Sequence, residues 1–97
     1  METVISDVIL QEFKDRMHLG DDEDDNLRRI LFASTKALIK DCGAYDINED
    51  ETFKELVFER SRYVYNDALE YFTKNFLTEI NSFGIAKALE EIKLDGD

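Results

Sequence analysis

Hydrophobic side chains recur at helical spacing in the first part of the chain. They follow one another at intervals of four, with Leu10 beside them: Ile5, Ile9, Phe13 and Met17. This period places them on one face of an α-helix. We expect the helix to begin at Ser6, whose hydroxyl can cap free backbone amides, with Asp7 in the favourable first turn. Gly20 is expected to end it.

A second helical pattern fills the segment that follows. The side chains expected on its buried face are Leu27, Ile30, Leu31, Ser34, Ala37 and Leu38. Five consecutive acids, Asp21–Asp25, precede them and are called the acidic turn below. Asp21 or Asp22 is the expected cap, since acids suit the positive end of a helix. Gly43 should end the helix through a left-handed residue, and a loop should follow over 44–49.

A third pattern, expected to form the longest helix over 51–75 with Asn48 or Asp50 as its cap, carries two apolar stripes. The first comprises Phe53, Leu56, Val57, Tyr63, Val64, Ala68 and Tyr71, and the second Phe58, Tyr65, Leu69, Phe72 and Phe76. A helix that is apolar over so wide an arc needs more than one packing partner. The second stripe is therefore a candidate contact with another subunit.

After Phe76 the helical pattern stops. The segment 76–83 is expected to be irregular or extended, and Ile85, Ala88, Leu89 and Ile92 predict a short amphipathic helix beyond it. The chain has no proline and only four glycines, and long segments without these breakers favour helices. We predict an all-α fold: a single domain over 1–97, built as a small bundle of three main helices plus a short C-terminal helix.

The charge of the chain is strongly acidic and unevenly distributed. Its formal net charge is −11, which disfavours binding to nucleic acid phosphates. Residues 1–26 contain nine acids and two bases, whereas residues 27–40 contain four bases and no acid. This polarity can orient one copy against the next, or it can simply keep the surface solvated.

The acidic turn does not match a calcium-binding loop. An EF-hand loop needs glycine at its sixth position and glutamate at its twelfth. A loop that starts at Asp21 has Asn26 and Phe32 at these positions, and the next register has Leu27 and Ala33. We therefore expect no metal site there.

Nucleophilic catalysis also lacks its components. Cys42 would need a base beside it, and His18, the single histidine, lies at the end of a different predicted helix. The glycines form no phosphate-binding loop. We predict that the chain is not an enzyme and uses no cofactor.

The sequence also indicates a compartment. A single cysteine excludes an internal disulfide and is typical of a reducing cytosol. No apolar run approaches the roughly 20 residues that a membrane-spanning helix needs, and the first residues lack the pattern of a signal peptide. We expect a soluble protein, made in a cytoplasm, that does not bind membranes.

Two sets of charged side chains are further candidate subunit contacts. Arg60 and Asp67 project near the apolar face of the third predicted helix, where charges must be paired or reach solvent. An arginine lying flat with its head in water is the alternative. Arg29, Lys36 and Lys40 form a basic side of the second predicted helix. This side is either solvated or meets the acidic turn of a neighbouring copy.

Two long segments resemble the small head–tail connector proteins, or adaptors, of long-tailed double-stranded DNA phages. The first segment is EFKDRMHLGDDEDDNLRRILFASTKALIKDCG. Its features follow the order seen in that family: a first helix ends in a short turn, an acid run opens the second helix, and a glycine closes it. The segment FKELVFERSRYVYNDALEYFTKNF is similar to the family's long, aromatic-rich third helix. The resemblance covers Val4 to about Ile92. The second predicted helix, however, ends in Asp41-Cys42-Gly43 without the family's common aromatic residue, and no proline follows it.

The resemblance implies a structural virion protein, assembled in the host bacterial cytoplasm and located at the head–tail interface. Such proteins form a ring beneath the portal that joins capsid to tail and extends the DNA channel. The implied partners are other copies of the chain, the portal protein and a downstream connector or tail-completion protein, with no sequence-specific binding of nucleic acid. Family members often dock on the portal through C-terminal segments, which makes 83–97 the candidate here. Its candidate docking residues are Phe83, Ile85, Leu89 and Ile92.

A second class of function is also compatible with the sequence. A small cytosolic helical adaptor or regulator would use the same surplus apolar surface to bind another protein. Ring formation, or co-purification with a portal, distinguishes the connector from this alternative.

Overall fold

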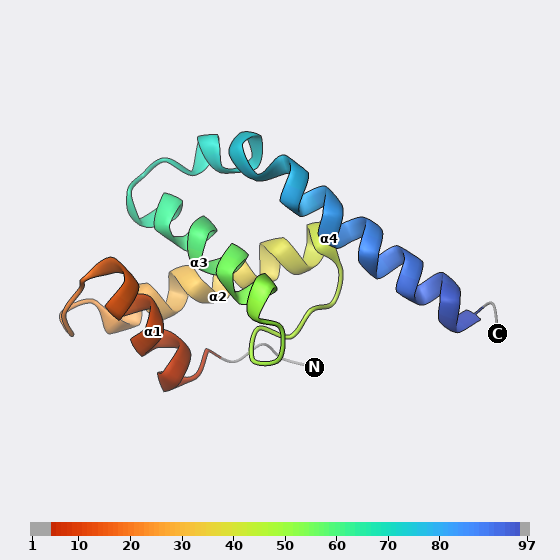
Figure 1. The fold of residues 1–97 in the computed structure, drawn as a ribbon. Helices are drawn as coiled ribbons and strands as arrows, with labels where there is room; N and C mark the ends of the chain where they lie inside the picture. Colours follow the sequence, from red (N-terminus) through yellow and green to blue (C-terminus); the bar gives the residue numbers. More distant parts are fainter. Residues whose placement is uncertain (1–4, 96–97) are drawn as a thin grey trace.

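The fold is described here from a computed structural model that covers residues 5–95, with the backbone alone for residues 93–95. Over this range the elements are α1 (Asp7–Met17), α2 (Asp24–Cys42), α3 (Glu51–Tyr65), the 3-10 turn η1 (Leu69–Tyr71) and α4 (Phe72–Asp95). The described residues contain no strand, so the predicted all-α class is confirmed (Figure 1).

Helix α2 lies at the centre of the molecule, and α1, α3 and α4 all pack on it. The largest side chains that are fully buried come from all four helices: Phe13, Leu27, Leu31, Leu38, Phe53, Phe58 and Phe72. Ser34 of α2 and Ser61 of α3 are also fully buried. The central helix thus contacts each of the other helices, and direct contacts such as Phe13–Phe58 between α1 and α3 and Phe53–Phe83 between α3 and α4 complete the core.

Two predicted helix starts and one helix end are confirmed. The Ser6 hydroxyl accepts a hydrogen bond from the Ile9 amide at 3.2 Å, and the Asp50 carboxylate accepts one from the Phe53 amide at 2.9 Å. Asp50, rather than Asn48, is therefore the cap of α3. Gly43 ends α2 at a φ of 107°, a value that favours glycine.

Two boundaries near the acidic turn were predicted wrongly. Helix α1 ends at Met17, so His18 and Leu19 lie in the turn as expected, but the residue that ends the helix in a left-handed conformation is His18, with φ 58°, rather than Gly20. Helix α2 begins at Asp24, and Glu23 precedes it without a side-chain cap. Asp21 is not the cap, because its carboxylate bonds the Lys14 amine instead.

The expected single helix over 51–75 is wrong. Helix α3 ends at Tyr65, Asp67 takes a left-handed conformation with φ 58°, and η1 reverses the chain. The reversal returns Phe72 to the core, where 2% of its surface is exposed and its ring lies 5.7 Å from that of Tyr63. Asn66-Asp67 supplies residues that tolerate the left-handed conformation.

The segment 76–83, expected to be irregular, is helical. It belongs to α4, which has a non-helical backbone angle pair only at Phe76. The C-terminal helix is thus much longer than the segment 85–92 that we predicted. Its second half projects from the body (Figure 1), and the radius of gyration, 14.2 Å, exceeds the ~13 Å of a compact chain of this size.

Candidate interaction surfaces

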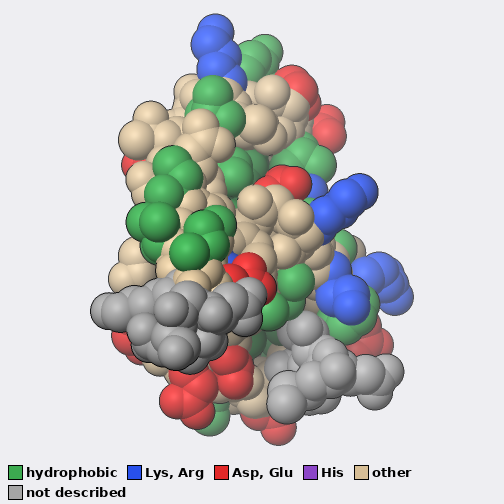
Figure 2. Space-filling model, turned by 90° about the vertical axis from the view of Figure 1, so that its right-hand side faces the viewer, with side chains coloured by type: hydrophobic (Ala, Val, Ile, Leu, Met, Phe, Trp, Pro, Cys, Tyr) green, Lys and Arg blue, Asp and Glu red, His purple; other side chains and the backbone are tan. Residues whose placement is uncertain are grey.

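The projecting half of α4 carries an apolar outer stripe, defined by Ile85, Leu89 and Ile92. These side chains are 61%, 60% and 65% exposed. With roughly 100° per helical residue they lie on the side of α4 opposite to Ile80, which is buried. In Figure 2, hydrophobic side chains lie exposed along the part of the molecule that faces the viewer. Three of the four residues predicted for docking are therefore at the surface.

Phe83, the fourth predicted docking residue, belongs to the intramolecular core. Its ring packs edge-on against Tyr45 at 5.0 Å and Phe53 at 5.9 Å, and its carbonyl accepts a hydrogen bond from the Tyr45 hydroxyl at 2.8 Å. Burial raises the pKa of this tyrosine. Residues 96–97 of the predicted docking segment lie outside the described residues.

Helix α4 leaves the body where it crosses the end of α2. Gly84 lies close to the carbonyl oxygen of Asp41, and the Lys87 side chain lies directly against Gly43. The Lys87 amine is 4.4 Å from the centre of the Tyr45 ring. Beyond this crossing, Ala88 to Ile92 are all exposed, so the outer stripe has no intramolecular partner among the described residues.

The second apolar stripe, predicted to contact another subunit, is covered mainly by the chain itself. Phe58 and Phe72 are each 2% exposed. The Phe58 ring packs on Phe13 of α1 at 5.5 Å, and the reversal after Tyr65 packs the Phe72 ring on Tyr63 at 5.7 Å. The Tyr65 hydroxyl donates to Glu23 at 2.6 Å, which raises the pKa of the tyrosine. Only Leu69, at 39%, is an exposed member of the predicted set.

Arg60 and Asp67 do not share a helix face. The Arg60 guanidinium donates to the Ser34 hydroxyl at 3.1 Å, and its burial lowers its pKa. Asp67 lies in the loop after α3 and is exposed. The expected position of both residues near the apolar face of one helix is therefore wrong for Asp67, because α3 ends at Tyr65.

The acidic turn is bound within the chain. The Lys14 amine, almost completely buried, donates to Asp21 at 2.5 Å and to Asp24 at 2.9 Å. These hydrogen bonds raise the pKa of Lys14, and the bond from Lys14 lowers that of Asp21. The turn therefore closes the α1–α2 connection, and three of its five carboxylates, those of Asp21, Glu23 and Asp24, have an internal partner.

The basic side of α2 is exposed and contains an aromatic residue that the sequence pattern did not single out. We call Arg29, Phe32, Lys36 and Lys40 the basic–aromatic face. Phe32 is 43% exposed, and the Lys36 amine is 6.0 Å from its ring centre. The sequence did contain a signal for this face. Phe32 lies three residues after Arg29 and four before Lys36, so the three side chains share the polar side of the helix.

A groove of about 150 Å³ lies between α3 and α4. Its residues are Thr52, Glu55, Leu56, Glu59, Phe76, Glu79 and Phe83. Leu56, Phe76 and Phe83 supply the apolar part, and three glutamates line its edges. We call it the α3–α4 groove. The sequence pattern could not reveal it, because it forms only when α4 folds back on α3.

The described residues contain no group of three or more histidine, cysteine or acidic side chains placed to hold a metal ion. Burial first, and then the charge of Asp41, raise the pKa of the Cys42 thiol to about 11. A thiol of this kind is a poor nucleophile at neutral pH. No helix among the described residues is both long and apolar enough to span a membrane.

Comparisons with known proteins found no relative of this chain. Neither family models, nor curated proteins, nor solved structures match the chain.

Proposed function

We propose that this chain is a non-catalytic assembly protein of the head–tail connector type. In this function the outer stripe of α4 docks on the portal protein, and copies of the chain form a ring that joins capsid to tail. The observation that carries the proposal is the exposed stripe of Ile85, Leu89 and Ile92 on a helix that leaves the body of the molecule.

The energetic argument concerns apolar surface. Complete burial of a Leu or Ile side chain contributes about 1.5–3 kcal/mol. Three such side chains, each about three-fifths exposed, leave several kcal/mol available to a partner that covers them. Isolated exposed apolar residues are ordinary, but a contiguous stripe is typical of a protein–protein contact.

Two further observations support the connector function. The order of helix, acid run, closing glycine and aromatic-rich segment is the one by which the sequence resembles the connector family. The strong negative charge suits a ring around translocating DNA, because carboxylates do not hold phosphates.

The test is capture of the portal protein encoded by the same genome, with the tagged chain as bait. We expect co-purification, and Ile85→Ser with Leu89→Ser should abolish it. Val8→Ser is the matched control, because Val8 is also an exposed apolar residue, at 67%, but lies on α1.

Retained capture by the Ile85→Ser, Leu89→Ser variant would show that the outer stripe does not dock on the portal. The alternative function, a small cytosolic adaptor or regulator, predicts no portal binding at all and a stable monomer. Under that alternative the same stripe would bind a different protein.

A further inference from the structure

We propose that successive copies of the chain contact one another through two different faces, with Phe32 of one copy inserted into the α3–α4 groove of the next. This inference rests on the proposed assembly function, because it names the surfaces through which copies would associate. It concerns a contact separate from the outer stripe of α4.

The donor surface is the basic–aromatic face. Phe32 is a large ring left 43% exposed on a helix whose opposite side is buried, with the Lys36 amine near its centre. Arg29, Lys36 and Lys40 form no ion pair among the described residues. An exposed aromatic ring with cations on the same side of its helix fits an apolar groove with an acidic edge.

The α3–α4 groove has those properties. Its volume of about 150 Å³ is that of a cavity that holds one benzene-sized ring. Glu55 and Glu59 are held by Arg16 at 2.5 Å and 3.7 Å, and Arg62 also bonds Glu59 at 2.8 Å.

Glu79 is the edge carboxylate without an ion pair among the described residues. Lys36 would approach it when the ring of Phe32 enters the groove. The groove edge has three glutamates, and two arginines bond them, so its net charge is still negative.

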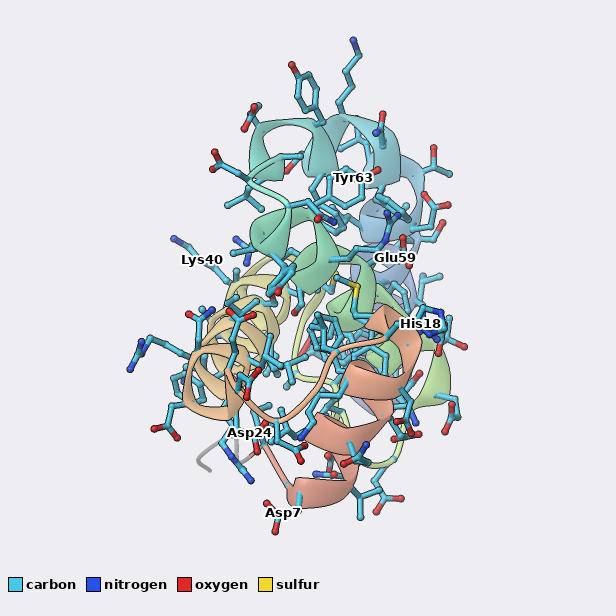
Figure 3. All side chains as sticks on the ribbon, turned by 90° about the vertical axis from the view of Figure 1, so that its left-hand side faces the viewer. Asp7, His18, Asp24, Lys40, Glu59 and Tyr63 are labelled. Carbon is cyan, nitrogen blue, oxygen red and sulfur yellow. The ribbon has the colours of Figure 1, made fainter. Side chains whose placement is uncertain are left out.

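The two faces lie on different sides of the molecule. In Figure 3, Lys40 projects from the left side, whereas Glu59 lies toward the right. Figure 2 shows lysine and arginine side chains gathered along one edge, apart from the apolar patch. A contact between two different faces is heterologous, so it repeats from copy to copy and closes into a ring when the rotation allows.

The acidic turn is a less suitable partner for the basic–aromatic face than the groove. Lys14 already bonds Asp21 and Asp24, and the turn offers no apolar surface for the Phe32 ring. The expectation that this turn meets the basic side of the next copy is accordingly replaced by the groove.

The experiment measures self-association of the whole chain by amide NMR spectra recorded up to about 1 mM, a range that detects weak complexes. We expect concentration-dependent shifts in residues 29–40 and in the groove, from which a Kd is obtained. Phe32→Ala should raise the Kd about tenfold or more, as expected when a central aromatic contact is truncated. Val8→Ala, the control, should leave it unchanged.

A charge exchange tests the orientation of the contact. Lys36→Glu and Glu79→Lys should each weaken association, and a mixture of the two variants should associate more tightly than either alone. Salt should weaken the wild-type contact, because exposed pairs are screened. These variants lie at exposed positions, so unfolding does not obscure the result.

The inference is overturned if the spectra do not change with concentration, if the shifts are confined to 85–92, or if Phe32→Ala keeps the wild-type Kd. Portal capture is measured separately. A chain that captures the portal through the outer stripe but lacks this contact refutes the inference alone. A chain with this contact that never captures the portal refutes the proposed function alone.

Discussion

Two lysines with almost fully buried side chains hold α1 against the rest of the molecule. Lys14 bonds the acidic turn, and the Lys54 amine of α3 donates to Glu12 of α1 at 2.9 Å. Both hydrogen-bonded arrangements raise the lysine pKa. Since removal of one member leaves a charge without its partner, these pairs contribute to the attachment of α1 beside its buried apolar side chains.

The Lys14–Asp21 pair predicts a defined pH dependence. The pKa of Asp21 is lowered from 3.8, so the pair's contribution is complete above 3.8 and is lost as the pH falls through the folded-state value. The pKa of Lys14 is raised from 10.5, so the contribution is also lost as the pH rises above 10.5. In urea unfolding, Lys14→Gln should be less stable than wild type at neutral pH. The difference should shrink or reverse at strongly acidic pH, where Asp21 is neutral and the Lys14 charge is left without its partner. A constant difference across the acid range would contradict the assignment.

At the scale of elements, the decisive feature is the break between α3 and α4. Asn66 caps the end of α3, and Asp67 is left-handed without being glycine. The left-handed conformation costs about 1–2 kcal/mol for most residues and less for aspartate. Packing of Phe72 against Tyr63 and Phe76 offsets this cost.

Asp67→Gly tests the break directly. We expect this variant to be as stable as wild type or up to about 1 kcal/mol more stable, because glycine adopts positive φ freely. A continuous helix would predict the opposite sign, a loss of about 0.3 kcal/mol, because aspartate is already nearly as poor a helix former as glycine. Ala86→Gly, at an exposed position inside α4, is the control for a glycine inside a helix and should lose about 1 kcal/mol. Chemical denaturation of both variants distinguishes the two structures.

At the scale of the whole molecule, α4 combines a packed inner side with a free outer side. The inner side, with Ile80 and Phe83, completes the core, whereas the outer stripe lies on the projecting half. The chain therefore has a stable body and a separate surface that can change without loss of the fold.

This division predicts that a polar substitution on the inner side of α4 lowers stability, whereas one on the outer side does not. Ile80→Ser should destabilise the chain by about 2–5 kcal/mol, since Ile80 is 7% exposed. Leu89→Ser should change stability by no more than about 0.5 kcal/mol, because 60% of its surface already faces solvent. Thermal unfolding measures both. A large loss in Leu89→Ser would mean that the second half of α4 packs on the body.

The candidate surfaces were predictable to different degrees. The spacing of Ile85, Leu89 and Ile92 defines one apolar helix side, but only the resemblance to the connector family singled out their segment as a docking surface. Phe32 was missed, since a single aromatic on a polar side has no periodicity. Phe58 and Phe72 were misassigned, because a second apolar stripe looks the same whether another subunit or the chain itself covers it.

The sequence by itself determined the local features: the all-α class, the cap at Ser6 and the helix end at Gly43, while it left Asn48 and Asp50 as alternative caps of α3. Each depends on residues three or four positions apart, so the pattern contains the whole interaction. Only the tertiary structure decided where α3 ends, which carboxylates meet Lys14, and that a groove exists. These outcomes depend on contacts between residues distant in the chain, such as the Tyr45 hydroxyl and the Phe83 carbonyl. Local propensity has no information about such contacts, and burial of the aromatic rings selects among conformations that the local sequence allows.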